Sequence, residues 1–142
     1  MMKKRPYIGC NYCICNGRLN GFLLCVPFID SDITALINVH EYTHAIMAYD
    51  KLGKKFDVTD DVEVLPMFYE KLFVLENPSN ELIEYKNYLD SCISEDSPLK
   101  YRLGLELQDI LIEEYEKKKC STKKLNRKTK RLVRTHKRRQ SD

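Results

Sequence analysis

Two histidines four residues apart, His40 and His44 in NVHEYTHAI (residues 38–46), constrain this 142-residue chain more than any other feature. Their imidazoles can face one common point only if the segment is an α-helix, because residues i and i+4 of a helix lie on the same face. The flanking segments ALINV and AIMAY are apolar, which predicts a largely buried helix. Two buried histidines need partners, and a shared metal ion would satisfy both.

Glu41 directly follows the first histidine and completes the pattern His-Glu-x-x-His. On a helix its carboxylate lies about 100° round from His40, beside a metal ion rather than on it. From there it can take a proton from a zinc-bound water, so the pattern predicts Zn²⁺ with Glu41 as the general base. The alternative is an ordinary amphipathic helix, because so short a motif also arises by chance.

A catalytic zinc site has three protein ligands and one open position, so the two histidines require a third ligand. Glu63 follows His44 after eighteen residues, near the start of the next predicted helix, and two antiparallel helices would bring it over the histidines. Glu70 is the alternative, because Pro66 disfavours a helix that begins well before it. The glutamate that does not bind the metal is expected to contact a ligating histidine from outside.

The arrangement His-Glu-x-x-His-x18-Glu resembles the gluzincin zinc metallopeptidases, which hold zinc with this motif and a downstream glutamate. HEYTHA is similar to the thermolysin pattern, and the eighteen-residue gap is similar to that of the aminopeptidase branch. Glu63 and Glu70 resemble an E-x6-E segment of the oligoendopeptidases and thimet oligopeptidases. These enzymes have Gly in place of Thr43, a longer gap and a much longer chain. In size the chain is closer to the minimal single-domain gluzincins.

The segment LKYRLGLELQDIL (99–111) is faintly similar to YKYATGLALAL of the oligoendopeptidase group, which aligns Tyr101 and Gly104. The resemblance implies that Tyr101 stabilises the oxyanion of peptide hydrolysis; the alternative is a core tyrosine. The function it implies is a small zinc-dependent metallopeptidase that acts on a peptide or protein substrate. Two other functions remain open: a regulatory protease like the ImmA/IrrE group that cleaves a repressor, and a non-enzymatic zinc-binding domain.

The predicted fold class is α+β and mainly helical. β-Prone runs at 11–15 and 21–29, joined by NGRLNG, predict an N-terminal β-hairpin. Asp30 or Ser31 can cap the active-site helix, predicted over 32–52, and three further helices are predicted over 61–75, 79–93 and 97–118. The second strand precedes the zinc helix, so it is expected either to align an extended substrate by backbone pairing or to be a core strand.

Charge divides the chain into two parts. Residues 1–116 contain 11 Lys/Arg and 20 Asp/Glu, a net charge of −9, whereas residues 117–142 have a net charge of +12. We therefore expect a zincin-like metallopeptidase domain over 1–118 and a basic, flexible tail over 119–142. The alternatives for the tail are weak, nonspecific contact with nucleic-acid phosphates and docking on the acidic body.

The remaining features concern thiols and membranes. Cys10 and Cys13 have the spacing of a structural zinc site that Cys15 and Cys25 could complete, but their apolar surroundings favour buried free thiols. No signal peptide is recognisable, and no apolar run approaches the ~18 residues that span a bilayer. The sequence therefore predicts a soluble, cytoplasmic protein without membrane contact.

Overall fold

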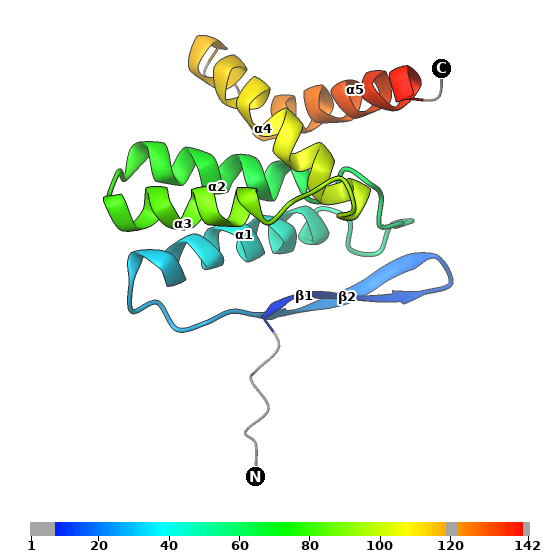
Figure 1. Cartoon of the computed structure of the whole chain (residues 1–142). Coiled ribbons are helices and arrows are strands. Elements are labelled where there is room, and N and C mark those ends of the chain that lie inside the picture. Colours follow the sequence, from blue (N-terminus) through cyan, green and yellow to red (C-terminus); the bar gives the residue numbers. More distant parts are fainter. Residues whose placement is uncertain (1–7, 119–121, 141–142) are drawn as a thin grey trace.

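A computed structural model describes residues 8–118 and 122–140. In chain order the elements are β1 (Gly9–Cys15), β2 (Arg18–Cys25), α1 (Asp32–Tyr49), α2 (Val64–Glu76), α3 (Asn80–Ser91), α4 (Leu99–Lys118) and α5 (Thr122–Gln140). The hairpin lies below α1, while α2 and α3 lie above it and α4 and α5 cross the top (Figure 1). The predicted class, α+β with an N-terminal hairpin and mainly helical, is confirmed.

The hairpin turns more tightly than its sequence suggests. Asn16 and Gly17 both adopt left-handed backbone conformations, with φ of 54° and 72°, which is the geometry of a two-residue hairpin turn. A connection of six residues was predicted, but the observed one has only two, because β2 already begins at Arg18. A bulge at Cys13/Ile14 adjusts the register of the two strands. Leu19 is fully buried, and its carbonyl accepts a hydrogen bond of 2.8 Å from the Gly53 N–H, which ties the hairpin to the segment after α1.

α1 begins after the predicted cap Ser31 and ends at Tyr49, three residues before its predicted end. The Ser31 hydroxyl accepts from the Thr34 N–H at 3.2 Å, and the Thr34 hydroxyl oxygen accepts from the Ser31 N–H at 3.0 Å. This reciprocal pair closes the first turn. α1 packs against the hairpin, α2 and α3, which explains why its apolar residues do not keep to one face.

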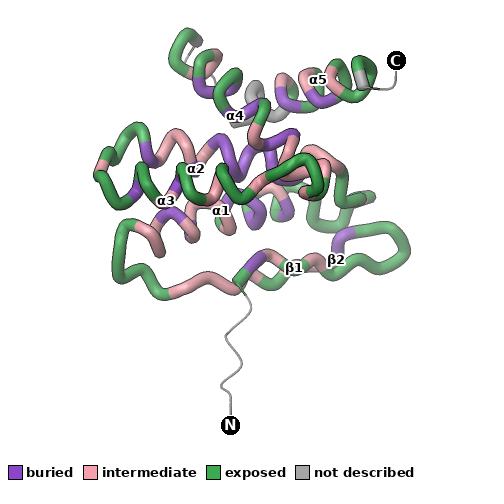
Figure 2. The backbone as a smooth tube through the Cα atoms, viewed as in Figure 1, coloured by how far each residue is buried: buried purple, intermediate pink, exposed green. Residues whose placement is uncertain are grey.

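α2 and α4 form the main core. Val64, Leu65 and Phe68 of α2 pack against a leucine row of α4 (Leu103, Leu107 and Leu111). Buried residues concentrate where α1, α2 and α4 meet, whereas the hairpin is mostly exposed (Figure 2). α2 begins at Val64 rather than at 61, so Pro66 lies in the first turn, where its missing N–H has no helical partner to lose.

The basic tail differs from the expectation of a flexible segment. α5 is a helix that packs on α4 and α2, with Val133 only 5% exposed in the main core. Its cations pair with the acidic body: His136 Nε2 lies 3.0 Å from Glu106 Oε2, and Lys137 Nζ lies 2.7 Å from Asp60 Oδ2. Leu132 and Val133 hold the helix on the body because both pack in the main core. Of the alternatives for the tail, the structure thus supports docking on the acidic body. The predicted boundary between domain and tail, at 118/119, falls beside residues 119–121, which lie outside the described ranges.

The cysteines of the hairpin are free, but they are not a buried set. Cys13 and Cys15 are exposed, and Cys10 and Cys25 are partly buried, because a two-stranded sheet is covered on one face only. Among the described residues they form no group that can hold a metal ion. Cys120 lies outside the described residues. In the described ranges no helix combines the length and apolar character that a bilayer crossing requires.

Candidate metal centre

His40, His44 and Glu63 converge between α1 and the start of α2. Nε2 of His40 lies 3.2 Å from Nε2 of His44, and Oε2 of Glu63 lies 3.0 Å and 3.1 Å from these two nitrogens. Three ligands of a tetrahedral zinc ion with bonds of 2.0–2.1 Å are separated by about 3.3 Å. The three donor atoms therefore already have nearly the spacing of a metal site, and the group can hold a metal ion.

Glu70 contacts the other side of the first histidine. Nδ1–H of His40 donates to Oε1 of Glu70 at 2.6 Å, which leaves Nε2 directed at His44 and Glu63. The second oxygen of Glu70 accepts from the buried ammonium of Lys86 at 3.2 Å, and Asp90 Oδ1 lies 3.0 Å from the same ammonium. Of the two candidate glutamates, Glu63 thus lies with the donor atoms and Glu70 holds His40 from outside.

Tyr12 has the corresponding position beside the second histidine. Its hydroxyl oxygen lies 3.4 Å from Nδ1 of His44, so that Nδ1–H can donate to it when Nε2 is free for a ligand. Burial, reinforced by the charges of Cys10, Glu63 and Glu41, raises the Tyr12 pKa and keeps its hydroxyl protonated. Each histidine is therefore oriented by a partner from a different element.

The site is strongly polarised when no metal ion is bound. Burial opposes a charge on His40, but the carboxylates of Glu63 and Glu70 outweigh it and raise the His40 pKa to about 10. Burial likewise opposes ionisation of Glu63, but its contacts with the two histidines lower the Glu63 pKa well below the usual range. A proton on His40 then occupies the place that a metal ion would take.

A cavity of about 200 Å³ opens over these groups. It is lined by Ile8, Gly9, Cys10, Tyr12, His40, Glu41, His44, Val58, Val62, Glu63, Lys100 and Tyr101. Glu41 and Tyr101, both predicted from the sequence, therefore face the same space as the three donor atoms. Burial, together with the charge of Glu41, raises the Cys10 pKa to about 11, so its thiol stays protonated beside the site.

Four polar residues of the site were not predicted as parts of it: Cys10, Tyr12, Lys86 and Lys100. Only Lys86 had a usable signal, because it follows Leu82 by four residues and so occupies the buried face of its helix. The strand that lines the cavity is β1 rather than the expected β2, whose first two residues instead form isolated bridges to residues 55 and 52.

Comparison of the chain with protein-family models, curated proteins and solved structures finds no match. The chemistry of the site is therefore inferred from its geometry.

Proposed function

We propose that the chain is a zinc-dependent metallopeptidase in which His40, His44 and Glu63 hold the metal ion. The supporting observation is the triangle of two imidazole nitrogens and one carboxylate oxygen with sides of 3.0–3.2 Å. Two nitrogens and one oxygen are a ligand set of catalytic zinc sites, and three protein ligands leave a position open to water. The fixed outer nitrogens of both histidines support a site built for a metal ion rather than an incidental cluster.

When bound, zinc would supply a Lewis acid that polarises the attacking water and the substrate carbonyl. Glu41 lies on the turn that carries the histidines and lines the cavity, so it is the proposed general base. It accepts a proton from the attacking water and then donates it to the leaving amine. Because Glu41 is not one of the three close donors, its role is separable from metal binding.

Tyr101 and Lys100 at the start of α4 are the proposed oxyanion-stabilising groups. Both line the cavity, and the Lys100 ammonium lies 5.0 Å from the centre of the Tyr101 ring. Burial is the main cause that raises the Tyr101 pKa, followed by the charge of Glu63, so the hydroxyl remains a hydrogen-bond donor. A substrate chain would extend along β1, whose edge away from β2 has no strand partner in the described residues.

The test combines metal analysis with peptide hydrolysis. We expect about one zinc per chain in the wild type, loss of zinc in His44→Ala, and retention of zinc with loss of hydrolysis in Glu41→Gln. Glu63→Gln should weaken zinc binding more than Glu70→Gln does. Loss of zinc in Glu41→Gln would refute its role as base. A wild-type protein that binds zinc but hydrolyses no member of a peptide library would instead indicate a non-enzymatic zinc domain.

A further inference from the structure

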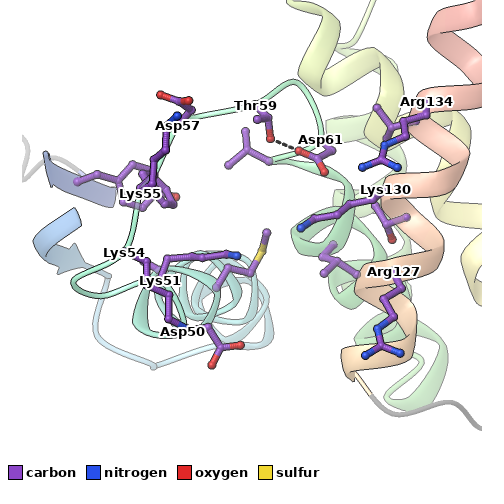
Figure 3. Close-up of a pocket in the computed structure, with 18 of the residues that line it drawn as sticks. Asp50, Lys51, Lys54, Lys55, Asp57, Thr59, Asp61, Arg127, Lys130 and Arg134 are labelled. Carbon is purple, nitrogen blue, oxygen red and sulfur yellow. Dashed lines mark hydrogen bonds between the residues drawn. The ribbon is translucent and has the colours of Figure 1, made fainter. Parts of the chain in front are cut away.

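A second and larger cleft adjoins the metal centre. It has a volume of about 780 Å³ and lies between α5 and the connection from α1 to α2 (Figure 3). Its floor is apolar and is formed by Met47, Ala48, Val62, Leu65 and Val133. The floor provides a surface on which apolar side chains of a ligand can be buried.

The walls of the cleft are predominantly cationic. Lys51, Lys54 and Lys55 lie on one side, and Figure 3 shows cations of α5 on the other. The α5 cations are Arg127, Lys130, Arg134 and Lys137. Their spacing of three or four residues places them along one face of the helix, over a length of about 15 Å. The lining also contains three aspartates, and Lys137 pairs with Asp60 outside the lining, so the seven cations still leave a net positive charge.

The cleft and the metal cavity share two lining residues, Tyr12 and Val62. Because the Tyr12 hydroxyl lies 3.4 Å from His44, a ligand that fills the cleft ends close to the metal centre. The two cavities therefore adjoin at Tyr12 and Val62, and a peptide long enough to reach both can place one segment over the donor atoms and another in the cleft.

We propose that this cleft binds an acidic segment of the substrate, in which Asp or Glu alternates with apolar side chains. This inference rests on the proposed peptidase function and adds a substrate class to it. The cationic walls complement carboxylates, and the 15 Å row of cations matches four or five residues of extended chain at about 3.3 Å each. The apolar floor favours a peptide over a nucleic acid, whose phosphate contacts would leave that floor uncovered.

Binding can be measured separately from catalysis by using Glu41→Gln protein and the fluorescence anisotropy of a labelled peptide. The probe is a twelve-residue peptide in which Glu alternates with Leu or Val, and the comparison peptide has Lys in place of every Glu. The cleft variant Lys54→Glu/Lys130→Glu is matched with Arg131→Glu/Arg139→Glu, which makes the same change in net charge at exposed positions outside the cleft lining. A duplex DNA of twenty base pairs serves as a competitor.

We expect the acidic peptide to bind, the lysine peptide not to bind, and the affinity to fall with salt. The cleft variant should bind the acidic peptide at least about tenfold more weakly, while the matched variant changes the affinity less than about twofold. Equal losses in both variants, or DNA that displaces the peptide and binds more tightly, would overturn the proposal. Acidic-peptide binding without turnover by the wild type would refute only the peptidase, and turnover that ignores acidic residues would refute only this inference.

Discussion

His40 contacts two glutamates through its two ring nitrogens, and the two contacts have different consequences. The short bond from Nδ1 to Glu70 orients the ring, whereas Nε2 faces Glu63 and His44. Lys86 neutralises Glu70 from behind, which stabilises a carboxylate that is only 6% exposed. Lys86, which the sequence did not identify as part of the site, thus supports Glu70, which the sequence did identify.

The first prediction concerns proton release at His40. Because the His40 pKa is raised to about 10 when no metal ion is bound, its ring carries a proton at neutral pH that a metal ion must displace. The apparent zinc affinity should therefore rise about tenfold per pH unit between pH 6.5 and 8.5. Calorimetric titration in buffers of different ionisation enthalpy should detect about one proton released per zinc. Affinity that is independent of pH would contradict this account.

The raised His40 pKa also determines how the stability of the metal-free protein changes with pH. A pKa raised above the unfolded value of about 6.5 contributes stability that is complete below that pH and is lost as the pH rises through about 10. Urea denaturation of the chelator-treated protein should therefore show a lower free energy of unfolding at pH 10 than at pH 7. His40→Gln is the control, and its difference between the two pH values should be smaller.

Replacing Lys86 tests the contribution of its buried ammonium. Lys86→Met removes the buried ammonium that contacts both Glu70 and Asp90, so the free energy of unfolding should fall by about 3 kcal/mol. Lys71→Met on α2 is the matched control: Lys71 pairs with the exposed Asp109, and the expected loss is below about 1 kcal/mol. The double variant Glu70→Gln/Lys86→Met should lose less than the sum of its single variants. Additive losses would show that the two groups do not interact.

At the scale of elements, α4 approaches the start of α2 at Gly104. A Cβ atom at this position would lie 2.3 Å from Sδ of Met67 and 3.2 Å from the carbonyl oxygen of Glu63. Without a side chain at this position, α4 can lie close to the backbone of Glu63, the residue that carries the third donor atom. This close approach also brings Tyr101, one turn earlier on α4, to the rim of the metal cavity.

Gly104→Ala tests this packing. Alanine favours a helix over glycine by about 1 kcal/mol, yet overpacking should reverse the sign and destabilise the protein by about 1–3 kcal/mol. Zinc affinity should fall as well, because the shift reaches Glu63. Gly21→Ala is the control, since its Cβ would meet nothing within 4 Å. A stabilised Gly104→Ala protein with unchanged zinc affinity would contradict the role of the contact.

At the scale of the whole molecule, α5 closes the core and forms one wall of the cationic cleft. Val133 packs with Leu103, Leu107 and Leu111, while Lys137 and His136 reach acidic residues of the body. The division of charge along the sequence thus becomes contact between an acidic body and a basic helix. The same helix keeps enough exposed cations to attract an anionic ligand.

Replacing Val133 tests whether α5 is part of the fold. Val133→Ala should lower the free energy of unfolding by about 1–2 kcal/mol, because it removes buried methyl groups from the core. Arg131→Ala, on the exposed side of the same helix, should stay within about 0.5 kcal/mol of the wild type. Deletion of 119–142 should destabilise more than Val133→Ala does. Identical urea denaturation curves for the wild type, the two point variants and the deletion variant would show that α5 does not contribute to the stability of the fold.

The local pattern of the chain determined the elements and much of the site. The order of a hairpin and four helices, the cap at Ser31, the shared face of His40 and His44, and the two glutamates within reach all follow from spacing and local preferences. Local signals suffice because a helix or a turn depends on neighbouring residues. α1 ends earlier than predicted because the residues after it form backbone hydrogen bonds with Leu19, which lies far away in the sequence.

Only the tertiary structure decided between Glu63 and Glu70, because both follow His44 at plausible distances and the packing of α2 on α1 selects which carboxylate faces Nε2. The packing of β1, α3 and α4 around these two helices brought Tyr12, Lys86 and Lys100 to the site, and no spacing in the sequence relates them to the histidines. α5 is the clearest case. Its few apolar residues are too weak a local signal for a stable helix, and Leu132 and Val133 acquire their effect only because α4 and α2 provide a surface on which they pack.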